Sequence, residues 1–205
     1  MRKKDSMEEI LAKSFMELAQ KKPIEKITIK EITDGAGVIR STFYNHFVDK
    51  YELIEWIVKD RLLGSVDVLI ENGMIKEAII VAGRNILHDR EFYKNAVKLG
   101  GQNSFESIIE KSVSDTFLEF FFSNPNAKNA HNAHNVWITP ERIAGYYAHA
   151  LTYIFIMWIE ADMVVSPEDM AEIYTYIEDK SLLDTVREMG VDPAIQGLEV
   201  VVTQV

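Results

Sequence analysis

Hydrophobic positions recur along most of this chain at intervals of three and four, the spacing of helices that each bury one face. In residues 6–20, one side collects Ile10, Leu11, Phe15, Leu18 and Ala19. The spacing predicts an all-α protein with helices over residues 6–20, 28–35, 38–47, 49–70, 74–87, 90–99, 105–122, 140–163 and 166–179. Residues 183–189 are compatible with another helix and 198–202 have a β-favouring composition, so the tail after residue 179 stays unassigned.

Polar residues and glycines mark where the N-terminal helices begin and end. Thr28 followed by Glu31 is a capping box, in which each side chain bonds to the other residue's backbone amide, and residues 49–52 repeat the pattern. Gly35-Ala36-Gly37 lies between two short helices, where glycine tolerates the left-handed conformation of a sharp reversal. We therefore predict a three-helix helix-turn-helix domain in residues 1–48 and a second helical domain in residues 49–205.

The short helix over residues 38–47 is crowded with polar side chains that can contact DNA. The second helix of a helix-turn-helix lies in the major groove, and its N-terminal part reads base edges. Arg40 can donate two hydrogen bonds to guanine, and Thr42 can offer a methyl group to thymine or a hydroxyl to phosphate. Phe43 and Phe47, one turn apart, have the spacing of core residues.

Other polar residues nearby suit the DNA backbone. Tyr44, His46 and Lys50 each carry a donor at the end of a long side chain, and Thr28 starts a helix whose amides can meet a phosphate. The candidate DNA-binding residues are Thr28, Arg40, Ser41, Thr42, Tyr44, Asn45, His46 and Lys50.

The charge distribution fits this interpretation although the whole chain has a net charge of −10. Residues 1–50 contain ten Lys or Arg and eight Asp or Glu, a net of +2, which leaves −12 for residues 51–205. A phosphate backbone would repel the acidic part of the protein, so docking would be confined to the basic end.

Several classes of protein find no support in the sequence. The chain has no cysteine, which excludes disulfides and thiolate chemistry and fits a cytoplasmic protein. The longest apolar run, Leu151 to Ile159, is far shorter than the roughly 18 residues that span a membrane. No nucleophile–base pair, phosphate-binding loop or metal-ligand spacing is present, so we expect no enzyme activity, cofactor or metal. His131 and His134 lie three apart in an Asn- and Ala-rich loop without further ligands, and we attribute them to loop composition.

The segment ITIKEITDGAGVIRSTFYNHFVDKYELI resembles the DNA-binding signature of the TetR family of bacterial transcription regulators. The resemblance covers residues 10–54 without a gap, and includes Thr28, the Ala-Gly-Val turn and the Thr-Phe-Tyr-x-His-Phe helix. It implies that Tyr44, His46 and Lys50 hold phosphates. Positions matching Arg40, Ser41, Thr42 and Asn45 vary with the operator. Ser41 replaces a frequent glycine and Asn45 a frequent aromatic residue, so base preference does not transfer.

Beyond residue 54 the resemblance is one of layout. Family members have a divergent helical C-terminal domain that dimerises through its last two helices and often encloses a ligand pocket. Residues 157–163 and 166–171, together with Arg-Ser-Thr-Phe-Tyr-Asn-His-Phe, resemble the subgroup that includes the dihydroxyacetone-kinase regulator DhaS. Members of that subgroup can sense a partner protein instead of a small molecule.

The helix over residues 140–163 is apolar nearly all round and must therefore be buried nearly all round. One stripe, which we predict to form the dimer interface, contains Ile143, Tyr147, Leu151, Ile154 and Trp158. A second stripe contains Tyr146, Ala150, Tyr153 and Met157. Packing one face inward and the other against a second copy would give a two-fold symmetric homodimer. The alternative is a central core helix of a monomer.

The aromatic residues of the C-terminal half are also candidates for a ligand site. The residues that could line such a cavity are Phe105, Phe117, Tyr147, His149 and Tyr153. A packed core would explain the aromatic residues equally well, and His149 could be a hydrogen-bonded core histidine.

Together these patterns predict a homodimeric regulator that binds a near-palindromic operator in double-stranded DNA, as a repressor released by a small-molecule effector. One alternative is a regulator controlled by a partner protein and able to activate. The other is a helical interaction protein without DNA binding.

Overall fold

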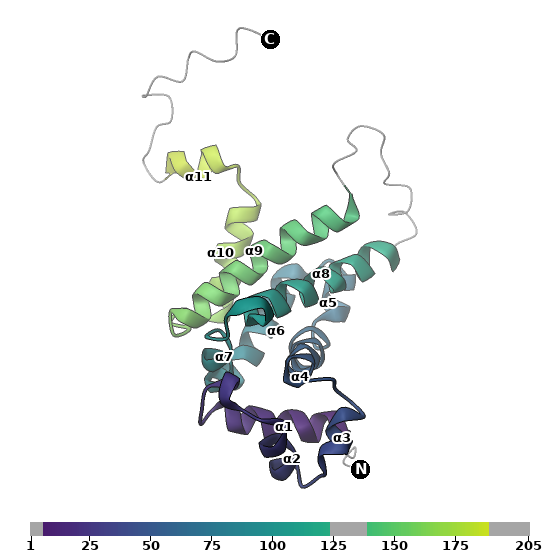
Figure 1. Cartoon of the computed structure of the whole chain (residues 1–205). Coiled ribbons are helices and arrows are strands. Elements are labelled where there is room, and N and C mark those ends of the chain that lie inside the picture. The colour runs from purple at the N-terminus through teal and green to yellow at the C-terminus, as the bar shows by residue number, and fades with distance from the viewer. Residues whose placement is uncertain (1–5, 124–138, 189–205) are drawn as a thin grey trace, which may run out of the picture.

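The computed structural model describes residues 6–123 and 139–188, with the side chains of residues 182 and 186 excepted, and these residues contain helices and no strand. The predicted all-α class is therefore confirmed. In chain order the elements are α1 (Met7–Ala19), η1 (Ile24–Lys26), α2 (Ile29–Ala36), α3 (Arg40–Tyr44), α4 (Lys50–Ile57), η2 (Val58–Leu63), α5 (Asp67–Glu71), α6 (Ile75–His88), α7 (Arg90–Ala96), η3 (Gly101–Asn103), α8 (Phe105–Ser123), α9 (Pro140–Glu160), α10 (Pro167–Glu178) and α11 (Leu182–Glu188). The first three helices form one end of the molecule, and the long pair α8 and α9 crosses above α4 (Figure 1).

The N-terminal helices begin where their capping residues predict. Ser6 caps α1, and Thr28 caps α2 through the reciprocal bonds with Glu31 that define a capping box. Gly37 ends α2 in the left-handed conformation, with φ of 69°. The third helix is shorter than predicted at both ends, since the regular helix runs only from Arg40 to Tyr44.

A close contact between α1 and α2 sets their spacing. Ser14 of α1 is buried, and its hydroxyl donates a 2.7 Å hydrogen bond to the carbonyl oxygen of Ile32 in α2. Gly35 faces the same side chain, and a Cβ added at Gly35 would lie 2.4 Å from the Ser14 Oγ. The absence of a side chain at residue 35 therefore lets the two helices approach each other.

The predicted single helix over residues 49–70 is wrong. Asp49 caps α4 as expected, although the capping box is incomplete because the Glu52 carboxylate accepts from the amide of Val48 and not from that of Asp49. The helix then widens into the π-helix η2 and breaks before α5. The amide of Gly64 reaches back five residues to the carbonyl of Lys59 at 2.7 Å, and a Cβ at Gly64 would lie 2.9 Å from the Asp60 carbonyl oxygen. Hydrophobic spacing cannot distinguish this wider turn from a regular helix over so few residues.

The end of α9 also differs from the prediction, because the helix stops at Glu160 and not at residue 163. Asp162 and Met163 adopt positive φ values of 59° and 52°, which reverses the chain toward α10. The Asp162 carboxylate accepts from Arg90 at 2.9 Å and from Lys94 at 2.7 Å, both on α7. These two bonds hold the carboxyl pKa of Asp162 below its usual range, with Lys94 contributing most.

One continuous cluster of buried side chains runs through the molecule from Leu11 to Tyr174. The N-terminal helices share this core with the later ones, since Phe15 of α1 packs edge-on against Phe92 of α7 with ring centroids 6.1 Å apart. Asn95 of α7 also donates to the Ala19 carbonyl at the end of α1. The division after residue 48 stays a prediction, because packing crosses it.

Candidate DNA interface and regulatory cavity

The recognition helix α3 is held from beneath by aromatic packing. Phe43 is fully buried and lies 5.7 Å, centroid to centroid, from Phe47. Phe47 in turn meets Trp56 of α4 at 6.3 Å. Because these rings occupy the inner side of α3, its other residues face outward, as the spacing of Phe43 and Phe47 predicts.

The outward side of α3 and the turn after it carries the predicted contact residues. Arg40, Ser41, Tyr44, Asn45 and His46 are exposed, while Thr42 is half-buried. The structure therefore brings together six of the eight candidates on one short segment at the end of the molecule where the N-terminal helices lie (Figure 1). A surface with a guanidinium, hydroxyls, an amide and an imidazole can donate to both base edges and phosphates.

His46 has a partner that the sequence did not indicate. Its Nδ1 lies 2.8 Å from Oε1 of Glu8, in the first turn of α1. The two residues are 38 positions apart, so no local pattern links them. This contact leaves Nε2 as the ring nitrogen available to another group.

Lys50 is bound to the protein itself. Its ammonium donates to the carbonyl oxygens of Ile24 at 2.9 Å, Glu25 at 2.8 Å and Ile27 at 3.1 Å, at the end of the turn η1. Desolvation lowers the pKa of Lys50, with the nearby carboxylates of Glu25 and Asp49 opposing this. The phosphate role expected for Lys50 would require at least one of these bonds to break, so Lys50 stabilises this connection in the structure as described.

Thr28 is exposed, as a phosphate contact requires, but its hydroxyl is already engaged. It donates to the Glu31 carboxylate at 2.8 Å and accepts from the Glu31 amide. Lys22 also binds this carboxylate, and the bond from Lys22, with those from Thr28, lowers the pKa of Glu31 to about 2. The N-terminus of α2 therefore already holds a carboxylate in the position where a phosphate would bind.

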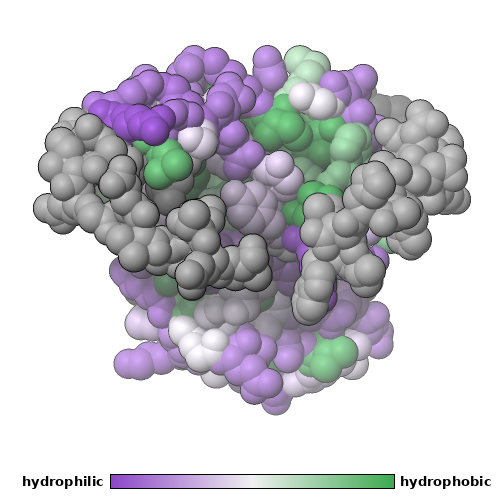
Figure 2. All heavy atoms as spheres, turned by 90° about the horizontal axis from the view of Figure 1, so that it is seen from above, coloured by the Kyte–Doolittle hydropathy of each residue, from purple (hydrophilic) through white to green (hydrophobic). Residues whose placement is uncertain are grey.

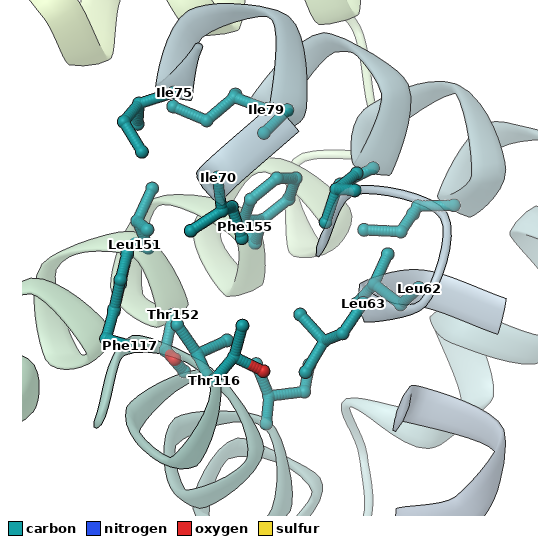
Figure 3. Close-up of a pocket in the computed structure, with 16 residues that line it drawn as sticks. Leu62, Leu63, Ile70, Ile75, Ile79, Thr116, Phe117, Leu151, Thr152 and Phe155 are labelled. Carbon is teal, nitrogen blue, oxygen red and sulfur yellow. The ribbon is translucent and has the colours of Figure 1, made fainter. Parts of the chain in front are cut away.

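The C-terminal domain contains a cavity of about 50 Å³ on the side of α8 and α9 that faces η2, α5 and α6. Figure 3 shows side chains from these helices pointing toward a common space. The wall is almost entirely aliphatic and aromatic and consists of Leu62, Leu63, Val66, Ile70, Ile75, Ala78, Ile79, Ala82, Ile86, Ile109, Val113, Thr116, Phe117, Leu151, Thr152 and Phe155. Of its two hydroxyls, that of Thr116 donates to the Ser112 carbonyl, and that of Thr152 has no hydrogen-bond partner among the described residues.

The structure separates the five predicted ligand residues. Phe117 lines the cavity, and with Tyr147 it also lines a neighbouring groove of about 430 Å³ between α6, α8, α9 and α10. Neither of these two spaces is lined by Phe105, His149 or Tyr153. Phe105 is packed against Tyr93 in the core, whereas His149 and Tyr153 point to the surface. His149 lies 3.6 Å from Glu110 of α8. The sequence missed the aliphatic lining, since helical spacing marks an apolar face without showing whether the space behind it is filled.

The two stripes of α9 face opposite directions from those predicted. Leu151 and Trp158, in the stripe expected to contact a second copy, are 8% and 5% exposed and pack into the core, with the rest of that stripe half-buried. The large apolar residues that are between 44% and 66% exposed on α9 and α10 are Tyr146, Tyr153, Met157, Ile173, Tyr176 and Ile177. The exposed apolar surface of these two helices is thus the other stripe of α9 and the adjacent face of α10, while most of the stripe predicted for the interface packs inward.

Two expected absences concern membranes and metals. Within residues 6–123 and 139–188, no helix is long and apolar enough to cross a membrane. The described part of the chain also holds no group of three or more His, Cys, Asp or Glu side chains arranged for a metal ion. His131 and His134 lie outside the described residues.

Comparison of the sequence with models of known protein families assigns the chain to a family. Residues 10–57 match the model of bacterial regulatory proteins of the tetR family, and residues 75–179 match a model described as a transcriptional regulator C-terminal region. The second match alone spans half of the chain. The protein is therefore a helix-turn-helix transcription regulator, and it belongs to the TetR family.

Its relatives include DhaS of Lactococcus lactis subsp. lactis (strain IL1403), an HTH-type transcriptional activator of the dhaKLM operon, which is 29% identical over 105 residues. That alignment covers 43% of this chain and 56% of DhaS. The uncharacterized regulator YxbF of Bacillus subtilis (strain 168) is 26% identical over 182 residues, 82% of this chain and 43% of YxbF. The matched regions thus span less than two thirds of either relative.

A solved structure supports the fold over nearly the whole length. The putative TetR-family regulator from Syntrophomonas wolfei str. Goettingen superposes with a TM-score of 0.58 at 16% sequence identity. The match covers 95% of this chain and 97% of the other. At 16% identity the similarity establishes the fold alone. The operator, the effector and the oligomeric state have to be argued from the residues of this chain.

Proposed function

We propose that this protein is a homodimeric transcription regulator that reads a near-palindromic operator with α3 in the major groove. The observation that carries the proposal is the exposed polar side of α3 above the buried Phe43 and Phe47. We assign residues 1–48 to DNA binding and residues 49–205 to regulation and dimerisation. Two recognition helices would enter successive major grooves about 34–36 Å apart.

Individual residues receive distinct roles in this proposal. Arg40, at the start of α3, reads a guanine through two parallel hydrogen bonds. Tyr44 and His46 hold phosphates, while Ser41, Thr42 and Asn45 tune base preference. Phosphate binding by Thr28 and Lys50 is less well supported, because their polar groups are already hydrogen-bonded within the protein.

The test begins with selection of bound fragments from genomic DNA and measurement of affinity for the recovered site by fluorescence anisotropy. Arg40→Ala should weaken binding by about 1–3 kcal/mol and relax base preference at one position. Arg84→Ala is a matched control, since Arg84 is an exposed arginine on α6 paired with Glu168, far along the chain from α3. Unchanged affinity and specificity in Arg40→Ala would remove this residue from readout. No selected DNA at all would favour the helical interaction protein without DNA binding.

The dimer proposal rests on the exposed apolar face of α9 and α10. The face of the molecule seen in Figure 2 carries hydrophobic residues grouped among hydrophilic ones. Exposed tyrosine, methionine and isoleucine side chains on two adjacent helices are the composition of an interface core. A regulator that binds two successive major grooves needs two recognition helices and therefore a second copy of the chain. In a two-fold symmetric dimer, the exposed face of α9 and α10 on one copy contacts the same face on the other.

Light scattering at micromolar concentration tests the assembly. We expect a dimeric mass for the parent protein and a monomeric mass for the double variant with Tyr153→Glu and Met157→Glu, which buries charges in the proposed interface. Val68→Glu is the control, because Val68 is also exposed and apolar but lies on α5. A monomeric parent protein would exclude this interface.

For regulation we propose a repressor released by a small, uncharged, apolar effector in the cavity beside η2. The Thr152 hydroxyl is the one side-chain group of the wall without a hydrogen-bond partner among the described residues, and the rest of the wall cannot replace the bonds that a polar molecule makes with water, so strongly polar guests are disfavoured. Release requires the effector to bind the two conformations of the protein with unequal affinity. A reporter gene under the selected operator should respond to apolar compounds and not to polar ones of equal size.

Control by a partner protein remains the alternative, and two observations favour it. The cavity is small, and α8 packs directly along α9, with the Phe117 and Tyr147 rings 6.4 Å apart. The relative DhaS is named an activator, so activation is an alternative sign of regulation. A reporter that responds to no small compound but to a co-expressed neighbouring gene would select this mechanism.

A further inference from the structure

The contact between Glu8 and His46 joins the first turn of α1 to the segment that follows the recognition helix. Oε1 of Glu8 and Nδ1 of His46 are 2.8 Å apart, and the two side chains are 31% and 29% exposed. The Ser6–Glu9 capping box begins α1 beside Glu8 and holds this turn in place. The contact is therefore made by a rigid element and fixes the orientation of the imidazole ring.

The carboxyl group of Glu8 decides which ring nitrogen carries a proton. Its own backbone amide lowers its pKa most; partial burial opposes this, and the bond to His46 lowers the pKa further. An ionised carboxylate can only accept hydrogen bonds, so the His46 nitrogen facing it must carry the proton. In a neutral imidazole that proton on Nδ1 leaves Nε2 with a lone pair and no hydrogen.

A neutral His46 held in this way cannot donate to DNA. Phosphate oxygens accept hydrogen bonds, and an Nε2 lone pair would face them with repulsion. The doubly protonated ring can donate from both nitrogens, to Glu8 on one side and to a phosphate on the other. We infer that Glu8 is a positioning residue: because it holds the proton of a neutral His46 on Nδ1, His46 must gain a second proton when each protomer binds the operator. This inference rests on the proposed DNA-binding function.

Other charged groups near His46 do not replace Glu8 in this role. Asp49 and Glu52, which follow His46 at the start of α4, direct their carboxylates to the backbone amides of residues 48, 51 and 52. Lys50 donates to the carbonyls at η1. The ring neighbour of the imidazole is Phe47, 6.4 Å away between centroids, which is apolar. Among the residues that the structure describes, Glu8 is the carboxylate in hydrogen-bond contact with His46.

Binding measured across pH tests the inference on the full-length protein. At constant ionic strength, the dissociation constant of the parent protein for its selected operator should rise with pH, by up to about tenfold per pH unit per protomer, because a neutral His46 must take up one proton on binding. Glu8→Gln should lose most of this dependence, because the Gln amide can donate to Nδ1 and leave the proton of a neutral ring on Nε2. The parent and the variant should then differ most at high pH.

Glu17→Gln is the matched control for the change of charge. Glu17 lies on α1 and is exposed, so its substitution alters the net charge equally without touching His46. It should shift the affinity at every pH and keep the parent pH dependence. Equal pH dependence in Glu8→Gln and the parent, or a parent protein whose affinity does not change with pH, would overturn the inference while the DNA-binding function stands.

Nitrogen-15 NMR of the imidazole tests the positioning role in the absence of DNA. At alkaline pH the signals of His46, assigned by their loss in His46→Gln, should report a proton on Nδ1 in the parent protein and a shift toward Nε2 in Glu8→Gln. A parent protein with the proton on Nε2 would refute the role of Glu8 even if it bound DNA. Failure of the parent protein to bind any DNA while the NMR result holds would instead refute the proposed function.

Discussion

The contact between Gly35 and Ser14 makes a quantitative prediction about the helix-turn-helix scaffold. In Gly35→Ala, the new Cβ would lie 2.4 Å from the Ser14 Oγ, a separation that real Cβ atoms do not tolerate. Ser14 can relieve the overlap by rotating about its first side-chain torsion, because its Cβ would remain at an ordinary 3.6 Å. Rotation removes the buried hydrogen bond to the Ile32 carbonyl.

The magnitude follows from two opposing effects. Losing the bond and leaving a buried hydroxyl unsatisfied costs about 1–3 kcal/mol. Replacing glycine by alanine within a helix returns up to about 1 kcal/mol through helix propensity. The net change in unfolding free energy for Gly35→Ala should therefore be a loss of about 1 kcal/mol.

A double-mutant cycle isolates the contact. Ser14→Ala removes the hydroxyl at a cost of about 1 kcal/mol, and in that background Gly35→Ala should be neutral or stabilising, because nothing is left to clash. The coupling energy between the two substitutions should be about 1–2 kcal/mol. Chemical denaturation followed by circular dichroism measures all four proteins. Gly145→Ala in α9, where an added Cβ meets nothing within 4 Å, reports the propensity effect alone. Additive effects at Ser14 and Gly35 would refute the reasoning.

Three further predictions concern stability and the cavity. Lys50→Met keeps the aliphatic stem but removes the ammonium from three carbonyls, so unfolding free energy should fall by about 1–2 kcal/mol, whereas a residue used only for phosphate contact would leave it unchanged. The pKa of Glu31, about 2, lies below its ordinary 4.5, so the stabilising contribution of this carboxylate is present above pH 4.5 and is lost as pH falls toward 2. The melting temperature of Glu31→Gln should therefore depend less on pH in that window than the melting temperature of the parent protein. An equal pH dependence in the two proteins would contradict this. Xenon, a small atom that enters dry apolar cavities, should raise the unfolding midpoint, with a gain of about 2.7 kcal/mol at a hundredfold excess over Kd. Ala82→Leu should abolish the gain by filling the cavity, and equal shifts in both proteins would place the binding elsewhere.

Local signals in the sequence were sufficient for the helix-turn-helix. Capping by Thr28, the reversal at Gly37 and the one-turn spacing of Phe43 and Phe47 are each determined by a few neighbouring residues, and each was confirmed. The outward direction of Arg40 and its neighbours followed from the same spacing, because a short helix with two buried rings has one remaining side. The all-α class followed from the same periodicity.

Contacts between distant segments could not be predicted in this way. The carbonyls that occupy Lys50 lie more than twenty positions away, and Glu8 lies 38 positions from His46, so neither partnership leaves a local pattern. The π-helix η2 keeps nearly the same hydrophobic spacing as a regular helix. Periodicity records which side of a helix is apolar and carries no information on what lies opposite.

The helix α9 separates what the sequence can predict from what the tertiary structure determines. The sequence by itself determined that apolar residues occupy almost the whole circumference of α9, and from this it predicted that the helix is buried nearly all round. It could not determine which stripe faces the core, because Leu151 and Tyr153 are equally suited to either environment. The packing of α9 against α8, α7 and α10 settled the choice, since it leaves Leu151 and Trp158 buried and Tyr146, Tyr153 and Met157 exposed. The hydrophobic effect is non-directional, so only the positions of neighbouring helices select the buried face.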